Sequence, residues 1–272
     1  MFSNVLRAML AAFLLATTIE ASAVAAPPPL EAYGDLPEVE DAAISPSGNN
    51  VAVLVRMNGT RMLVFLGPGN TLIRQLAVGD VKIRYFDWIG DDRVMLVRSQ
   101  TEDLRGFTTD KAEVATAQVI PVTFDGPIQT IFGSDRRLAN AVFGDYGIRR
   151  IDGRWVAFFG TLEFRRDGSA YSFDHGRPFL YATDIEKDDN RRIASPTGAG
   201  TSRDWLIDRN GQVAATLDID RTNGRWEIRG PDNDRLAEGR QSAGRVGLIG
   251  LGFGGATAVY SERGEDDITR WY

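Results

Sequence analysis

The pattern of apolar and polar positions repeats five times along the chain. Each copy has an apolar lead-in, a tight turn, and a short apolar run of the kind that forms a buried strand. Successive turns are 43, 62, 58 and 44 residues apart and fall at Gly48, Asp91, Gly153, Gly211 and Gly255. The apolar runs that follow are residues 51–55, 94–97, 156–159, 213–217 and 256–260. A repeat of roughly 40–50 residues built from short strands is typical of propeller blades, and the longer gaps indicate insertions.

Three outer hairpins are predicted from the segments that follow these runs. Their paired strands are residues 61–66 with 71–77, 179–184 with 191–194, and 226–230 with 235–238. Gly, Pro, Asn and Asp occupy the reversals, because they tolerate or pre-set the backbone angles of turns. Each blade would then contain an inner strand, a Gly/Asp turn, a buried strand and an outer hairpin. Almost no helix is expected, because no segment after the N-terminal region sustains a 3.6-residue apolar period.

The predicted fold is therefore an all-β β-propeller. A β-sandwich is the alternative, since it also has evenly spaced short strands, but the repeat here is a multi-strand unit. About five blades are recognisable, and residues 269–272 resemble an unfinished strand, so we expect an incomplete or truncated ring. Trp88 and Trp205, each preceded by an Asp and followed by a turn, are expected at equivalent buried positions. The acidic stretch 262–267 is expected to be exposed.

The N-terminus has the pattern of a secretion signal. Arg7 precedes an apolar stretch at residues 8–19, and A-x-A-like cleavage sites lie at residues 21–23 and 23–25. The stretch is short for a permanent membrane span, although an uncleaved anchor is the alternative. We expect a signal peptide at 1–26, a linker at 27–42 and propeller blades at 43–272, with export to a periplasm and no other membrane association.

Composition excludes several classes of function. The chain has no cysteine, which excludes disulfides, thiol nucleophiles and cysteine-ligated zinc. Its net charge of −6 argues against nonspecific binding of nucleic acid or of anionic membranes.

Candidate catalytic chemistry is sparse. The one histidine, His175, is interpreted as a loop residue between Asp174 and Gly176, with a general base or metal ligand as the alternative. The nucleophile motif G-x-S-x-G is absent, and residues 239–244 have the wrong spacing for it. No catalytic residue is therefore predicted.

Candidate binding motifs are equally weak. Acidic groups at Asp91 and Asp92, Asp188 and Asp189, and residues 262–267 do not match a calcium loop. The closest match, Asp232 and Asp234 with Glu238, is better interpreted as a hairpin turn. The glycine-rich stretch 247–255 precedes an apparent strand instead of the helix that a dinucleotide site needs. No cofactor and no metal are predicted.

Several segments resemble a known family. Residues 29–37 (PLEAYGDLP) followed by 44–48 (ISPSG) are similar to the start of the propeller in bacterial exported serine peptidases of the prolyl-oligopeptidase family. Residues 87–94 and 204–211 are similar to later blades of that group, so the likeness covers most of 29–272. The resemblance implies an N-terminal propeller that caps a C-terminal α/β-hydrolase domain with Ser, Asp and His. That catalytic half is missing here, so no catalytic residue is carried over.

Three functions follow from these observations. The first is the substrate-gating propeller of such a peptidase, non-catalytic as the chain stands, with peptide substrates reaching the missing hydrolase domain. The second is a stand-alone periplasmic propeller that binds a protein or peptide, as TolB-like propellers do. A third, a propeller enzyme with a central metal or quinone, is disfavoured by the single histidine.

Overall fold

The computed structural model describes residues 38–103, 111–168, 170–173, 175–241 and 245–272. These residues form β-strands and two short 3-10 helices, Pro68–Asn70 and Phe253–Gly255. Within this part of the chain there is no α-helix, and none of its helices has the length and apolar character needed to cross a membrane. The predicted scarcity of helix is confirmed. The predicted signal peptide and most of the predicted linker lie outside the described residues.

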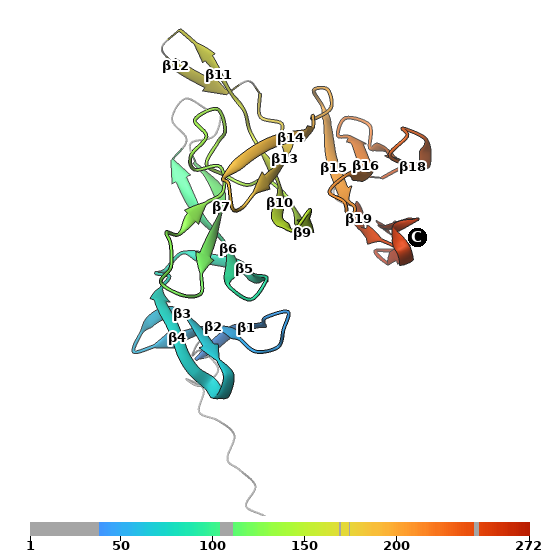
Figure 1. Cartoon of the computed structure of the whole chain (residues 1–272). Helices are drawn as coiled ribbons and strands as arrows, with labels where there is room; N and C mark the ends of the chain where they lie inside the picture. The colour runs from blue at the N-terminus through green and yellow to red at the C-terminus, as the bar shows by residue number, and fades with distance from the viewer. Residues whose placement is uncertain (1–37, 104–110, 169, 174, 242–244) are drawn as a thin grey trace, which may run out of the picture. The chain divides into compact units, whose positions relative to one another are not determined.

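The strands form successive antiparallel sheets, each built from a consecutive stretch of chain (Figure 1). Sheet 1 contains β1 (Val39–Ile44), β2 (Val51–Met57), β3 (Thr60–Gly67) and β4 (Thr71–Ala77). Sheet 2 contains β5 (Lys82–Ile89), β6 (Arg93–Asp103), β7 (Lys111–Pro121) and β8 (Gln129–Thr130). Sheet 3 contains β9 (Asp145–Ile151), β10 (Arg154–Thr161), β13 (Phe179–Asp184) and β14 (Asp189–Ala194). The strand β1 begins ahead of residue 43, where the sequence placed the first blade.

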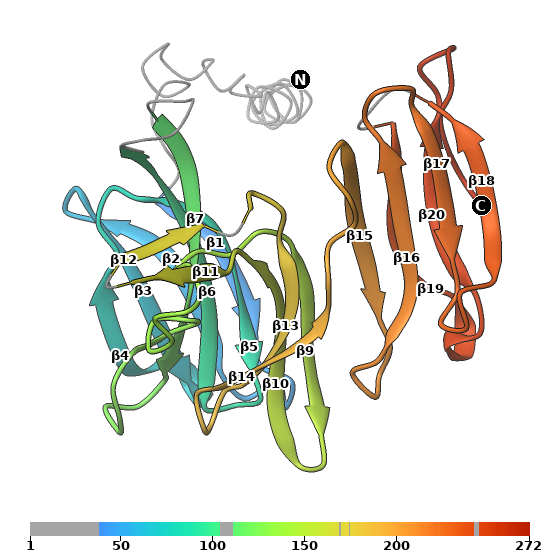
Figure 2. The ribbon, with the colours of Figure 1, turned by 90° about the horizontal axis from the view of Figure 1, so that it is seen from above.

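The last two sheets follow the same order. Sheet 4 contains β15 (Thr201–Ile207), β16 (Val213–Asp220), β17 (Arg225–Arg229) and β18 (Arg235–Arg240), which run side by side in Figure 2. Sheet 5 contains β19 (Val246–Leu251), β20 (Ala258–Arg263) and β21 (Thr269–Trp271). A separate hairpin, β11 (Phe164–Asp167) with β12 (Ala170–Phe173), is inserted into sheet 3 between β10 and β13. This insertion accounts for one of the long repeat spacings.

Short hairpins set the register of the sheets. Asn58 and Gly59 join β2 to β3, and Asp152 and Gly153 join β9 to β10, with positive φ at all four residues. Asn-Gly and Asp-Gly pairs favour this two-residue turn because its twist matches that of the strands. The predicted outer hairpins are confirmed as β3–β4, β13–β14 and β17–β18.

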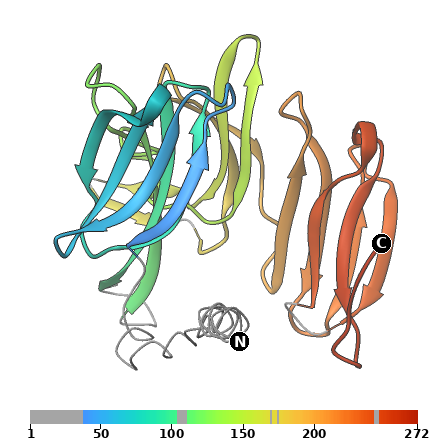
Figure 3. The same cartoon turned by 90° about the horizontal axis from the view of Figure 1, so that it is seen from below.

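The apolar cores lie between successive sheets. One core joins sheets 1 and 2, a second joins sheets 2 and 3, a third joins sheets 3 and 4, and a fourth joins sheets 4 and 5. On β10, Ala157 and Phe159 point into the second core while Phe158 points into the third. Four-stranded meanders that bury both faces against their neighbours in sequence are the construction of a β-propeller. The described chain is an all-β β-propeller, and Figure 3 shows its sheets from the opposite side to Figure 2.

Burial differs from the prediction in two strands. Residues 94–97 are all buried, and 157–159 are buried as well, so β6 and β10 are covered on both faces. In β2 and β16 burial alternates, and the prediction of continuous burial is wrong there. Only one face of β2 contributes to a core, through Ala52 and Leu54. The sequence predicted β13 as a hairpin strand but did not indicate that every one of its residues is buried.

Both predicted tryptophans are buried, with Trp88 6% and Trp205 3% exposed. Each lies on the first strand of its sheet, but their registers differ. Trp88 pairs with Val94 directly after the turn, whereas Trp205 pairs with Thr216 because the β15–β16 connection is longer. Trp88 and Trp205 therefore occupy the same strand of their sheets and are both buried, but they pair with different positions of the next strand.

Candidate functional site

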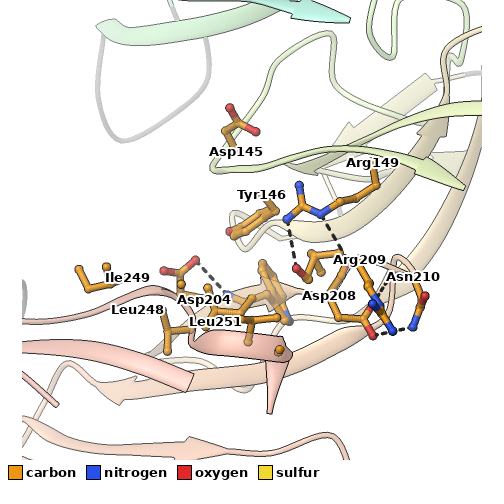
Figure 4. A pocket seen from close by; sticks show the side chains of 16 residues that line it. Asp145, Tyr146, Arg149, Asp204, Asp208, Arg209, Asn210, Leu248, Ile249 and Leu251 are labelled. Atoms are coloured by element: carbon orange, nitrogen blue, oxygen red, sulfur yellow. Dashed lines mark hydrogen bonds between the residues drawn. The ribbon is translucent and has the colours of Figure 1, made fainter. Parts of the chain in front are cut away.

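The first strands of sheets 3, 4 and 5 line a cavity. First strands of successive sheets contact each other, with β9 against β15 and β15 against β19. Between these three strands lies a cavity of about 670 Å³ (Figure 4). The turns that follow β15 and β19 complete its wall. The cavity is thus built by segments about 60 and 40 residues apart, which only the stacking of the sheets brings together.

Asp145 begins β9 at one side of the cavity. Its carboxylate accepts a hydrogen bond from the hydroxyl of Tyr85 on β5, and another from the backbone N–H of Gly147 at 2.8 Å. Burial, and then the charge of Asp145, raise the pKa of Tyr85, so this hydroxyl stays protonated and remains a donor. Asp145 itself is exposed and keeps capacity to accept a further hydrogen bond.

Tyr146 and Asp204 form the centre of the site. The ring of Tyr146 packs edge-on against Trp205, with centroids 5.4 Å apart. The Asp204 carboxylate accepts a hydrogen bond from the backbone N–H of Trp205 at 3.0 Å. Burial raises the pKa of the Asp204 carboxyl, and burial together with the Asp204 charge raises that of Tyr146. The pair therefore places a phenolic donor beside a carboxyl acceptor, next to an aromatic wall.

Arg149 and Asp208 fix the turn at the end of β15. The Arg149 guanidinium donates to the carbonyls of Ile207 at 3.1 Å and Asp208 at 3.3 Å, across the junction of sheets 3 and 4. The Asp208 carboxylate accepts from the N–H groups of Asn210 at 2.9 Å and Gln212 at 2.8 Å. These groups hold the cavity wall in place, and their hydrogen-bonding capacity is mostly used within the protein.

The arrangement is suited to binding. It combines hydrogen-bond donors, carboxylate acceptors, the aromatic ring of Tyr146 and the apolar side chains of Leu248 and Ile249. Cavities of this size and mixed lining hold small molecules or short peptide segments. Among the described residues, no group of three or more His, Asp or Glu side chains is placed to hold a metal ion.

The histidine and the acidic groups that the sequence analysis weighed as catalytic or metal-binding candidates lie outside the cavity lining and have structural contacts. The ring of His175 stacks on Phe179 with centroids 5.2 Å apart, and its Nδ1 accepts the backbone N–H of Arg177 at 3.2 Å. His175 does not line the cavity. Asp234 belongs to a hairpin turn, in which its carbonyl accepts the N–H of Gly230 at 2.9 Å, as the hairpin interpretation of this stretch predicted.

The other acidic groups tie elements together. Asp91 accepts the backbone N–H of Ser47 at 3.0 Å, and Asp188 accepts the side-chain amide of Gln129 at 2.9 Å, so each joins two sheets. Asp266 pairs with Arg270 at 2.6 Å. In the stretch 262–267, residues 263 and 265–267 are exposed, which agrees with the prediction, while Glu262 and Gly264 are partly buried.

The glycine-rich stretch contributes to the cavity in an unexpected way. The N–H of Gly252 donates to the carbonyl of Thr257 at 2.8 Å, and the turn leads into strand β20, as the sequence interpretation required. Gly254 and Gly255 then form part of the cavity wall. The sequence did not indicate Asp145, Tyr146, Arg149 or Asp204 as site residues. The feature that these four residues share is their place on the first strand of a sheet.

Comparisons with known proteins add little beyond the fold. No family model matches the chain, and no curated protein matches it. Among solved structures it is similar to hydrazine synthase of Kuenenia stuttgartiensis, with 10% identity, 85% of this chain and 70% of that one covered, and a TM-score of 0.43.

Two further similarities are at the same level. For TolB from Acinetobacter baumannii the identity is 12% and the TM-score 0.37. The match covers 86% of this chain and 53% of that one. For the β-propeller domain of the Trilobed protease from Pyrococcus furiosus the identity is 10% and the TM-score 0.40. The match covers 86% of this chain and 65% of that one. The chain thus spans about half to two thirds of the length of these two structures. Likenesses this distant carry no argument about function, and the propeller assignment rests on the sheets and cores described above.

Proposed function

We propose that this chain is the substrate-admitting β-propeller of an exported serine peptidase of the prolyl-oligopeptidase kind. In this role it binds and selects peptides, and the covalent chemistry belongs to a hydrolase domain. The observation that carries the proposal is the cavity between β9, β15 and β19, because it provides a peptide-sized site on first strands. The order of the segments 29–37, 44–48, 87–94 and 204–211 behind a signal-like N-terminus supports the peptidase part.

The lining of the cavity fits a peptide better than a small charged metabolite. The Tyr146 hydroxyl donates to Asp204, and the remaining lone pairs of both groups offer acceptors for the amide N–H groups of a backbone. Leu248, Ile249 and Tyr146 offer apolar surface for side chains. Selection would then depend on shape and on a few hydrogen bonds, so that extended peptides are accepted and folded proteins are excluded by size.

The test uses the protein as its native host makes it. A chromosomally encoded affinity tag on this chain allows capture from the periplasmic fraction, followed by labelling with a fluorophosphonate probe for serine hydrolases. We expect a labelled species in the captured material, and hydrolysis of short chromogenic peptides but not of a folded protein. The isolated chain of residues 27–272 should show no turnover, with or without His175→Ala.

Capture from the periplasm without probe labelling and without peptide hydrolysis would contradict the peptidase role. If the captured chain in that case still binds peptides, the stand-alone binding propeller is the correct account. Recovery of the chain only from the cytoplasm would contradict export.

A further inference from the structure

A second cavity lies beside the first, and it has a different chemical character. Its volume is about 550 Å³, and it is lined by β9, by the loops before β13 and β15, and by the turn after β16. Tyr146 lines both cavities, and its hydroxyl would lie 2.5 Å from a Cβ added at Gly144, which also lines the second one. Among the described residues that line them, the first cavity has three aspartates, whereas the second has three arginines and no carboxylate.

One of the three arginines is already neutralised. Arg203 donates to the two carboxylate oxygens of Asp218 at 2.7 and 2.6 Å, and also to the carbonyl of Ser195 at 3.3 Å. A two-point Arg–Asp contact of this kind is rigid and strong. Arg203 therefore forms a fixed wall of the cavity and contributes little net charge.

The other two arginines, Arg177 and Arg221, form no ion pair with a carboxylate of the described residues. The Nε–H of Arg177 is shielded from solvent and donates to no acceptor, which is a cost that a nearby anion would offset. The backbone N–H of Arg221 donates to the carbonyl of Gly200 at 2.9 Å, which holds this exposed residue beside the loop that precedes β15.

The backbone around these arginines is open to a ligand. A Cβ added at Gly176 would meet no atom within 4 Å, and one at Gly200 would meet only the Thr222 hydroxyl at 3.7 Å. Gly200 also has φ of +83°, a conformation that side chains rarely adopt. Phe143, Pro178 and Pro196 supply apolar walls beside the charged groups.

We propose that this second cavity binds the carboxylate of a peptide, at its C-terminus or on an acidic side chain. Planar guanidinium groups match a carboxylate in shape and charge, and the apolar walls fit the residue that bears it. The apolar walls favour a peptide over inorganic phosphate, which has no apolar part to place against them. This inference does not rest on the peptidase role or on the first cavity.

The test measures binding of a tetra-alanine peptide with an uncharged dye at its N-terminus and a free C-terminal carboxylate. The same peptide with an amidated C-terminus is the matched ligand. The purified chain of residues 27–272 should bind the free acid at least tenfold more tightly than the amide, and the preference should weaken as salt is raised. Inorganic phosphate should compete poorly.

The double variant Arg177→Gln with Arg221→Gln should abolish the preference for the free acid. The control is Arg136→Gln with Arg166→Gln, which makes the same charge change at two exposed arginines outside the cavity lining. Circular dichroism and thermal melts establish that both variants fold. Equal affinity for acid and amide, an unchanged preference in the Arg177/Arg221 variant, or phosphate competition as strong as that of the peptide would each overturn the proposal.

Discussion

At the level of single residues, the pairs Asp87–Trp88 and Asp204–Trp205 connect neighbouring sheets. Asp87 and Asp204 each accept the backbone N–H of the following tryptophan, at 2.8 and 3.0 Å. The indole N–H of Trp88 then donates to the carbonyl of Ala43 on β1 at 2.9 Å, and Trp205 packs against Tyr146 on β9. In both cases the ring reaches the first strand of the preceding sheet, so each tryptophan contributes to two sheets.

Truncation of these rings should be costly. Trp88→Ala and Trp205→Ala should each lower the free energy of unfolding by roughly 3–5 kcal/mol, because a buried ring leaves a cavity that the sheets cannot refill. Trp271, which is 69% exposed, provides the matched control. Trp271→Ala should change the free energy of unfolding by about 0.5 kcal/mol or less in the same urea titrations. Similar losses for all three variants would contradict the inter-sheet role.

The raised pKa of Asp204 predicts a pH-dependent effect. Because burial favours the neutral form, the folded state binds this proton more tightly than the unfolded state, whose carboxyl has a pKa near 3.8. Ionised Asp204 therefore destabilises the fold increasingly as pH rises from 3.8 through the folded pKa. Asp204→Asn should gain stability relative to wild type over this range, and the difference should level off above it. Urea titrations from pH 4 to 8 measure this, and a pH-independent difference would contradict the assignment.

At the scale of elements, the turns after the first strands decide how closely sheets approach. Gly48 and Gly211 both have φ of +77°. A Cβ at Gly48 would meet no atom within 4 Å, but at Gly211 it would lie 2.5 Å from Ile151 Cδ1 and 2.9 Å from Phe158 Cζ. The β15–β16 turn thus packs directly on sheet 3, and glycine at 211 is needed for space as well as for backbone angle.

These two glycines form a matched pair for measurement. Gly48→Ala and Gly211→Ala incur the same backbone penalty, while only the second introduces a clash with the neighbouring sheet. We expect Gly211→Ala to be more destabilising than Gly48→Ala by about 1–3 kcal/mol in equilibrium unfolding. Equal effects would show that sheet 4 does not pack on sheet 3 as described.

The hairpins were predictable from the sequence because their signals are local. Asp152 with Gly153 and the turn at residues 231–234 specify reversals through residues adjacent in the chain. Burial was only partly predictable. The run at 51–55 is as apolar as the run at 94–97, yet only β6 is covered on both faces, and that depends on which sheets flank a strand.

At the scale of the whole molecule, the candidate site could not be predicted in the same way. Asp145, Asp204 and Leu248 have no sequence motif in common and are brought together only by the alignment of β9, β15 and β19. The sequence identified the repeat, and hence that such first strands exist, but not which side chains point into the space between them.

If the cavity on the first strands receives peptides, a photo-reactive side chain placed in it should crosslink to them. Ile249 lines the cavity and is 47% exposed, while Leu72 on β4 lies outside its lining and is 58% exposed. A benzophenone amino acid is placed at one or the other position, the chain is irradiated with a labelled peptide mixture, and adducts are quantified by mass spectrometry. We expect peptide adducts from position 249 that excess unlabelled peptide suppresses, and only background from position 72. Equal labelling at the two positions, or labelling at 249 that competitor does not reduce, would contradict it.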